Sequence, residues 1–210
     1  MSEGPVVGQG AEVEAKERGA TSDLILDAAF RILASEGYQS LTARRVAEEA
    51  GTNLALVNYY FGGKKGMLLA LYDRLERQRY QRQLALYDDE SEPLSVKWRR
   101  AVEYYKQDLA EGFVRVHHEL QAQGMAEGDL AMRAKERVMT WREMLVSAAA
   151  RYLPDIGVEM PAKQLVTVLA ASWFGMEQHH LLNVEESEIP YFALLEGIGE
   201  WLEAREAAAP

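Results

Sequence analysis

The sequence of 210 residues has no cysteine, only six prolines and no long apolar run. The lack of cysteine excludes disulfide bonds, thiolate nucleophiles and thiolate metal sites. A transmembrane helix requires about 18 or more consecutive apolar residues, and no such stretch occurs. Residues 1–19 are polar and acidic, and they lack the apolar segment of a signal peptide. We therefore expect a cytoplasmic protein that does not interact with a membrane.

The sequence also lacks the short motifs that accompany common enzymatic chemistry. It has no glycine-rich phosphate-binding loop, no nucleophile elbow and no His-Glu-x-x-His zinc motif. We therefore predict that the protein is not an enzyme and that it needs no cofactor.

Acidic residues are in excess, and they are unevenly distributed. The formal net charge is −10, yet residues 21–82 hold nine basic and seven acidic groups and so carry +2. Residues 83–210 hold twelve basic and twenty-two acidic groups, which amounts to −10. A polyanionic partner would therefore be repelled by the C-terminal part and would approach the N-terminal part.

Apolar residues recur at the spacing of amphipathic helices, and we find no strand pattern. The first apolar stripe consists of Leu24, Ile25, Ala28, Ala29, Ile32 and Leu33. We expect an all-α protein with helices over about residues 22–36, 42–49, 54–60, 64–83, 94–112, 114–124, 129–152, 162–183 and 190–204. Residues 1–20 contain few large apolar side chains, and we expect them to form a disordered tail.

Two of these helices are short and are separated by Gly51, which is the spacing of a helix-turn-helix. Gly51 supplies the positive φ of a tight turn, and Ala47 and Ala50 are small enough for the helices to cross closely. Thr42 and Asn53 stand where they can cap the first turns of the two helices. The second helix would place its first turn in the major groove of DNA.

Several side chains around these helices suit contacts with DNA. The guanidinium of Arg44 matches the O6 and N7 acceptors of guanine. Arg44 and Arg45 diverge by about 100° on a helix, so one of them is expected to be a phosphate or surface residue. Tyr59, Tyr60 and Lys64 carry donors suited to phosphate oxygens; the alternative is a core position for the tyrosines and a solvated helix start for the lysine.

At these positions the sequence resembles the TetR family of bacterial transcriptional repressors. The resemblance covers about residues 22–69 and is carried by Leu41-Thr42, Val46-Ala47, Ala50-Gly51, Tyr59-Tyr60-Phe61, Lys64 and Met67-Leu68. It implies phosphate contacts from Thr42, Tyr59, Tyr60 and Lys64, and base-edge contacts from Arg44, Asn53, Leu54, Ala55, Leu56 and Asn58. Thr52, Asn58 and Lys65 replace the family's usual Val, Tyr and Glu, which leaves the operator sequence open. Leu54 and Leu56 would contact thymine methyl groups, unless one of them turns inward as core.

We expect three parts in this chain: a tail over residues 1–20, a helix-turn-helix DNA-binding domain over residues 21–66, and a ligand-sensing and dimerisation domain over residues 67–210. Helix-turn-helix proteins usually bind as pairs to two half-sites, and the resemblance implies a homodimer formed by the last two long helices. The candidate interface residues are Leu165, Leu169, Trp173, Met176, His180, Phe192, Leu195, Ile198 and Leu202. The alternative for these residues is an ordinary core within one chain.

All four tryptophans lie after residue 82. An apolar cavity lined by aromatic and methionine side chains would suit a small organic ligand. The candidate ligand-binding residues are Trp98, Tyr105, Phe113, His117, Met139, Trp141, Met144, Trp173 and Glu177. Each of them is alternatively a simple core residue, and the sequence does not identify the ligand.

The four histidines form two adjacent pairs, His117-His118 and His179-His180, with Glu119 and Glu177 nearby. Neighbouring residues on a helix diverge by about 100°, whereas zinc pairs on helices favour a spacing of four. We therefore expect these histidines to lie on the surface or on a dimer face and assign no metal ligands, and a metal site at the pairs stays open as the alternative.

The resulting hypothesis is a TetR-type transcriptional regulator that binds a near-palindromic double-stranded DNA operator as a homodimer. An unknown small-molecule effector would release it by moving the helix that begins near Lys64. Two alternatives stay open: an activator of the same architecture, and an adaptor whose helix-turn-helix binds a protein partner.

Overall fold

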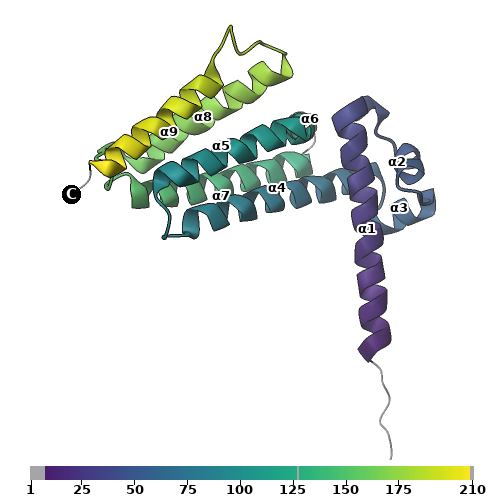
Figure 1. Cartoon of the computed structure of the whole chain (residues 1–210). Coiled ribbons are helices and arrows are strands. Elements are labelled where there is room, and N and C mark those ends of the chain that lie inside the picture. The colour runs from purple at the N-terminus through teal and green to yellow at the C-terminus, as the bar shows by residue number, and fades with distance from the viewer. Residues whose placement is uncertain (1–7, 127, 209–210) are drawn as a thin grey trace, which may run out of the picture. The chain divides into compact units, whose positions relative to one another are not determined.

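The computed structural model describes residues 8–126 and 128–208, and within them it contains nine α-helices, one short 3-10 helix and no strand (Figure 1). This confirms the all-α prediction. None of the described helices combines the length and apolarity that a membrane span requires. The elements are α1 (Gly8–Glu36), η1 (Tyr38–Ser40), α2 (Ala43–Glu49), α3 (Leu54–Phe61), α4 (Lys64–Asp88), α5 (Leu94–Ala110), α6 (Phe113–Ala126), α7 (Gly128–Tyr152), α8 (Ala162–Leu181) and α9 (Tyr191–Ala207).

The helix boundaries agree with the sequence prediction except at two places. Helix α4 continues to Asp88 instead of ending near residue 83, and α1 begins at Gly8 instead of near Ser22. The prediction of a disordered tail is therefore wrong for residues 8–20, while residues 1–7 lie outside the described part of the chain. Residues 11–18 are rich in alanine, glutamate and lysine, which have high helix propensity, and extending an existing helix costs little compared with starting one.

The chain divides into two compact units, Met1–Arg74 and Leu75–Pro210, and the division falls inside α4. It lies later than the boundary that we expected after residue 66. The N-terminal unit contains α1, η1, α2, α3 and the first half of α4. The C-terminal unit contains the rest of α4 and all of α5 to α9.

The core of the N-terminal unit lies between α1, α2, α3 and α4. Its buried residues include Ile25, Ala28, Ala29, Ile32, Leu33, Leu41, Val46, Val57, Met67 and Leu71. Most of the predicted α1 stripe is therefore confirmed as core. Leu24 is an exception, because its side chain is 57% exposed, and Leu26 is buried in its place. Arg74 of α4 forms an ion pair with Asp27 of α1 at 2.7 Å, which joins the two helices at the surface.

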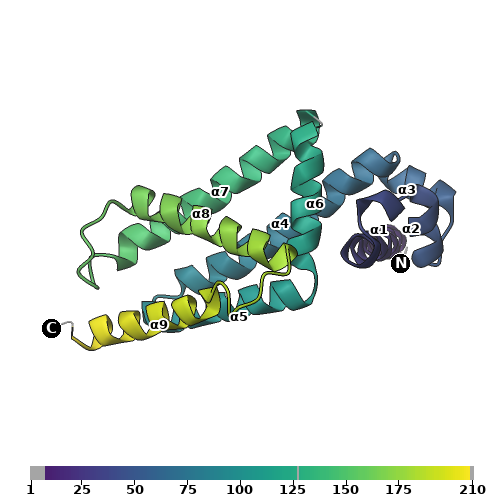
Figure 2. The ribbon, with the colours of Figure 1, turned by 90° about the horizontal axis from the view of Figure 1, so that it is seen from above.

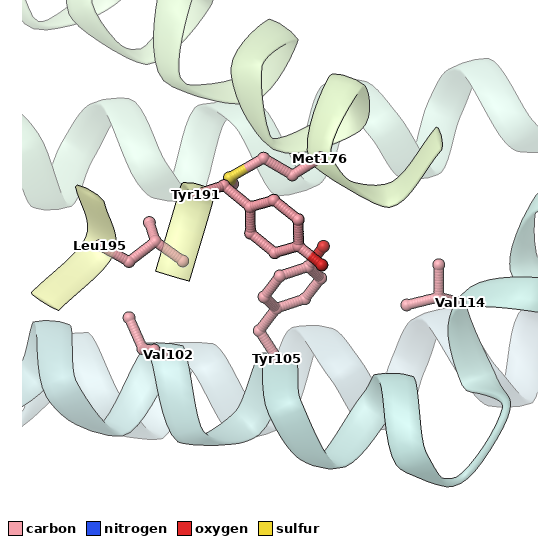
Figure 3. Packing of buried hydrophobic residues seen from close by; sticks show 6 residues of the cluster. All are labelled: Val102, Tyr105, Val114, Met176, Tyr191 and Leu195. Carbon is pink, nitrogen blue, oxygen red and sulfur yellow. The ribbon is translucent and has the colours of Figure 1, made fainter. Parts of the chain in front are cut away.

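In the C-terminal unit α5 packs along α9, and α7 packs along α6 and α8 (Figure 2). One buried cluster joins α5, α6, α8 and α9 through Val102, Tyr105, Val114, Met176, Tyr191 and Leu195, and in it Tyr105 and Tyr191 point toward each other (Figure 3). A second cluster joins Leu153, Ile156 and Leu202 near the end of α9. These two clusters position the helices whose side chains line the cavities described below.

Candidate functional site

Helices α2 and α3 both begin at a side-chain cap, as the sequence predicts. The Thr42 hydroxyl accepts a hydrogen bond from the Arg45 backbone N–H at 3.1 Å, and the Asn53 side-chain oxygen accepts one from the Leu56 N–H at 2.9 Å. Each cap contributes about 1 kcal/mol to helix stability. The first turns of both helices are therefore fixed locally, before any partner is present.

The turn between α2 and α3 is built on Gly51, whose φ is 63°. The Gly51 N–H donates to the Glu48 carbonyl at 3.2 Å, and the Thr52 N–H donates to the Ala47 carbonyl at 2.9 Å. This pair of bonds is the Schellman arrangement that closes a helix C-terminus with a left-handed residue. The chain therefore reverses in a few residues, and Asn53 can start α3 at once.

The face of α3 that begins at Asn53 is open to solvent. Asn53, Leu54, Ala55, Asn58 and Tyr59 are exposed, Leu56 is half-buried and Val57 is buried. Leu54 and Leu56 were expected to contact DNA unless one of them turned inward. Leu54 faces outward with an exposed fraction of 44%, whereas Leu56 is partly covered. Of the α3 residues expected at base edges, Asn53, Leu54, Ala55 and Asn58 are thus accessible, and Leu56 is partly covered.

The two arginines of α2 have different surroundings. The Arg44 side chain is 84% exposed and pairs only along its own helix with Glu48, at 3.2 Å. Arg45 instead bonds to Glu36 of α1 at 2.7 Å and to Glu49 at 3.2 Å. The hydrogen bond that Arg45 donates to the Glu36 carboxylate is the main reason that the pKa of Arg45 lies above its ordinary value. Arg45 therefore fastens α2 to α1, and Arg44 is the arginine that can reach a partner.

Tyr59 and Tyr60 follow on α3 and differ in exposure. The Tyr59 side chain is 69% exposed, whereas Tyr60 is half-buried and meets the Tyr59 ring edge-on at 5.3 Å. Lys64 is also half-buried: its ammonium lies 3.8 Å from the centroid of the Tyr38 ring and 3.5 Å from the Tyr38 carbonyl. Tyr38 therefore holds the start of α4 against η1, a role that the sequence reading did not assign to it.

Gly66, in the first turn of α4, is a further residue that the sequence reading missed. A Cβ atom added at this position would lie 1.9 Å from the carbonyl oxygen of Phe61, the last residue of α3. Only glycine lets the backbones of α3 and α4 approach this closely. Gly66 thus fixes how α3 is held by the long helix that follows it.

The comparisons with known proteins agree with this geometry. Residues 25–71 match the model described as "Bacterial regulatory proteins, tetR family". The N-terminal unit is thus similar to the DNA-binding part of tetR-family regulators. The HTH-type transcriptional regulator BetI of Brucella anthropi is 39% identical over 54 residues, which cover 26% of this chain and only 28% of the relative. The curated relative is thus matched over about a quarter of its length.

Solved structures of tetR-type regulators resemble the chain over most of its length. A putative transcriptional regulator from Saccharomonospora viridis in complex with choline has a TM-score of 0.70 and 20% identity, and the match covers 89% of this chain and 95% of that one. The regulator FadR from Bacillus subtilis in complex with stearoyl-CoA has a TM-score of 0.68 and 16% identity, with coverage of 85% and 96%. At these identities the similarity establishes the fold of the C-terminal unit.

The C-terminal unit contains an apolar cavity of about 330 Å³. It is lined by aromatic side chains, including Trp98, Trp141 and Trp173 of the predicted ligand-binding set, and by aliphatic residues of α5, α7, α8 and α9. Gln83 and Tyr87 of α4 also line it. The indole N–H of Trp141 donates to the side-chain oxygen of Gln83, which connects α7 to α4 at the cavity wall.

A second, polar cavity of about 280 Å³ shares Trp141, Ala170 and Trp173 with the apolar cavity. It is lined by Glu76, Arg79, His117, Gln121, Arg142 and Glu177, among others. Burial raises the pKa of Glu76, but the hydrogen bond from His117 and the charges of Arg79 and Arg137 outweigh it and leave the pKa below its ordinary value. His117 and Glu177, both predicted from sequence, therefore belong to this cavity.

The remaining predicted ligand-binding residues do not line either cavity. Tyr105 is buried in the core cluster between α5 and α9, and Met144 is buried in α7. Phe113 stacks on the His117 ring at 5.9 Å. Met139 is 47% exposed and lines neither of the two cavities.

Most of the predicted dimer-interface residues pack inside the chain. Met176, Phe192 and Leu195 belong to the core cluster with Tyr105, and Leu165, Leu169, Trp173, Ile198 and Leu202 line the apolar cavity. Of the nine residues only His180 is exposed. Both the inward and the outward faces of α8 and α9 carry apolar residues. The spacing of apolar residues in the sequence therefore did not distinguish the two faces, and the residues that it selected lie on the inward ones.

The outward faces of α8 and α9 carry a different apolar set. Val168 on α8 and Leu194 on α9 are each 61% exposed. Trp201 on α9 is also exposed, and it lies at the edge of the apolar cavity that it helps to line. Gly175 and Gly197 lie in the middle of these helices, and a Cβ atom at either position would meet nothing within 4 Å. A helix-interior glycine costs roughly 1 kcal/mol relative to alanine, and no packing within the described chain accounts for either of them.

Proposed function

We propose that this chain is a transcriptional regulator that binds a near-palindromic DNA operator through α2 and α3. The proposal rests above all on the open face of α3, where Asn53 caps the helix and Leu54, Ala55 and Asn58 are exposed together. Arg44 adds an exposed guanidinium beside them. The net charge of +2 over residues 21–82, within a chain of −10, favours the approach of a phosphate backbone to this unit.

Phosphate contacts in this proposal come from residues around the base-reading face. Tyr59 is 69% exposed and Thr42 is exposed at the start of α2, so the hydroxyl groups of both can reach a phosphate. Lys64 would act from beside Tyr38, where its ammonium is held, and Tyr60 from beside Tyr59. These contacts would set the register of the protein on DNA, whereas Arg44 and α3 would read the bases.

The proposed homodimer uses the outward faces of α8 and α9. Val168, Gly175, Leu194, Gly197 and Trp201 recur at helical spacing and would form an apolar, closely packed contact between two copies. The two helix-interior glycines support this choice, because small residues let helices approach closely and neither glycine is needed within one chain. A two-fold pair would present two copies of α3 to two half-sites.

The proposed effector is a small apolar molecule that occupies the apolar cavity. Its volume of about 330 Å³ lies in the range of small-molecule sites. Helix α4 carries Gln83 and Tyr87 in the cavity wall and Gly66 beside α3, so a ligand that displaces α4 would alter the DNA-binding unit. A coupling of about 1–3 kcal/mol would relieve DNA binding by roughly 5- to 150-fold.

Selection of genomic fragments by the purified protein, with Arg44→Ala in parallel, tests the DNA-binding part. We expect one two-fold motif, and a loss of about 1–3 kcal/mol for the variant if Arg44 pairs with a guanine. Arg115→Ala is the matched control, since Arg115 forms the same i,i+4 pair with Glu119 but lies on α6. Failure to recover any motif at low salt with a well-folded dimer would favour a protein partner for the helix-turn-helix. A reporter gene downstream of the motif distinguishes repression from activation.

A further inference from the structure

Three side chains of metal-binding type converge beside the polar cavity. His117 and His118 come from α6 and Glu177 comes from α8, and the three offer donor atoms that lie within 4.8 Å of one another. His117 and Glu177 are buried, and the His118 side chain is only 10% exposed. Buried imidazole and carboxylate groups in such proximity occur in proteins either as hydrogen-bonded pairs or as ligands of a metal ion.

Each of the two imidazoles is held by a second polar side chain. The Nδ1 atom of His118 lies 2.8 Å from the Gln178 amide nitrogen, and its Nε2 atom lies 2.7 Å from a Glu177 oxygen. The Nε2 atom of His117 lies 3.0 Å from Glu76, a buried carboxylate of α4. Histidines that bind metals are usually held in this way, with one ring nitrogen fixed by a carboxylate or amide and the other bound to the ion.

The donor atoms, which lie within 4.8 Å of one another, must move to reach the spacing of ligands around one ion. Zinc binds imidazole nitrogen and carboxylate oxygen at about 2.0–2.2 Å, so two such ligands at a tetrahedral angle stand roughly 3.3 Å apart. The His118–Glu177 distance of 2.7 Å would therefore widen slightly, and the Gln178 amide would turn its oxygen toward Nδ1–H. The ligands come from α6 and α8, whose side chains already meet at the His118–Glu177 pair.

We propose that His117, His118 and Glu177 bind one divalent transition-metal ion of the zinc class. Two imidazoles and one carboxylate form a set that holds zinc with one coordination position left open. Because His117 and Glu177 line the polar cavity, the open position would face that cavity and accept water or a donor atom of a small molecule. This proposal is independent of the DNA-binding function.

The helical divergence of adjacent histidines does not prevent this arrangement. The His117 and His118 rings are perpendicular, with centroids 5.7 Å apart, and Glu177 reaches them from a different helix. Two arginines also line the polar cavity, and both are engaged elsewhere. The Arg79 guanidinium lies 4.8 Å from the centroid of the Trp141 ring, and Arg142 donates to the Thr167 hydroxyl at 2.7 Å.

Titration of the chelator-treated full chain with Co²⁺ tests the site directly, because four-coordinate Co²⁺ bound by nitrogen and oxygen absorbs visible light. We expect saturation at one Co²⁺ per chain, and displacement by Zn²⁺. Glu177→Gln and His118→Gln each remove one ligand, and each should weaken Co²⁺ binding by at least about tenfold. A loss of about tenfold is the smallest that is typical when a residue that only holds a metal ligand in place is replaced. Circular dichroism of both variants checks that the helices persist.

His180→Gln is the matched control, because His180 belongs to the other adjacent histidine pair and is exposed near the end of α8. We expect it to bind Co²⁺ like the unmodified chain. Loss of binding in His180→Gln with retention in Glu177→Gln would assign the metal to surface histidines and overturn the proposal. Absence of saturable binding in the unmodified chain would show that the two histidine–glutamate pairs are only hydrogen-bonded. No DNA is present in the titration, so its failure leaves the regulator proposal unaffected.

Discussion

Substitution of Gly66 by alanine should destabilise the N-terminal unit, although alanine is the better helix former. The added Cβ would lie 1.9 Å from the Phe61 oxygen, which is about 1.1 Å short of the 3.0 Å that Cβ contacts respect. Because the Phe61 oxygen belongs to the backbone, it cannot turn aside as a flexible side chain would. The helices α3 and α4 must therefore move apart to make room for the added Cβ atom. Forced overpacking typically costs about 1–3 kcal/mol, and the gain in helix propensity returns at most roughly 1 kcal/mol.

We therefore expect a net loss on the order of 1–2 kcal/mol, which for a unit of this size lowers Tm by roughly 4–16 °C. Thermal and denaturant unfolding followed by circular dichroism measures this loss. Operator binding should weaken as well, because the C-terminus of α3 is the part that is displaced.

Gly19→Ala provides the matched control for this prediction. Gly19 also lies inside a helix, α1, but a Cβ atom there meets nothing within 4 Å. We expect this variant to be as stable as the unmodified chain or more stable, by up to roughly 1 kcal/mol. If Gly66→Ala behaved like Gly19→Ala, the close approach of α3 and α4 would not be a constraint in solution, and the reasoning would fail.

Three further predictions test other parts of the molecule. A Cβ atom at Gly197 would meet nothing within 4 Å, so Gly197→Leu should abolish the proposed dimer in sedimentation analysis without lowering helix content; a dimer that persists would contradict the proposed interface. Ala149→Leu fills part of the apolar cavity with a larger side chain and should reduce the fluorescence of bound anilinonaphthalene sulfonate at unchanged stability, whereas unchanged fluorescence would place the dye elsewhere. Glu49→Gln should reduce stability at neutral pH and have no effect in acid. The hydrogen bond from Arg31 lowers the pKa of Glu49 below its ordinary value of 4.5. The stability that the Glu49 carboxylate contributes is therefore present above pH 4.5 and is lost as the pH falls through the pKa of the folded state. A difference between the two chains that persists in acid would show that the carboxylate charge is not the cause.

The local features of the fold could be predicted from the sequence because each depends on a few neighbouring residues. Gly51 is followed within two residues by Asn53, and this pattern alone specifies a helix end and a helix start. The period of apolar residues likewise located the helices. Residues 8–20 were misjudged because the prediction weighed their few apolar side chains and not the helix propensity of their alanines and glutamates.

Features that depend on contacts between helices could not be predicted in the same way. Gly66 is an ordinary helical glycine in the sequence, and only the position of Phe61 explains it. The histidine pair of α6 meets Glu177, which lies about sixty residues later in the chain. The spacing rule for metal ligands within a single helix could not detect this cluster. Both Tyr38 and Lys64 are surface-type residues whose contact depends on the packing of η1 against α4.

Helix α8 shows why the predicted dimer residues pack inside the chain and what the proposed dimer face implies for regulation. A helix that is apolar on several sides does not reveal which side its own chain covers, and on α8 the large side chains Leu165, Leu169 and Trp173 turn to the cavity. The smaller and more exposed set with Val168 and Gly175 remains for a second copy in the proposed dimer. One rigid helix would then form a wall of the effector cavity and half of the contact between subunits. A ligand that shifts α8 by a fraction of a helical turn would change how two copies pair, and with it the separation of their α3 helices. Effector response and dimer geometry would accordingly be coupled through α8 as well as through α4.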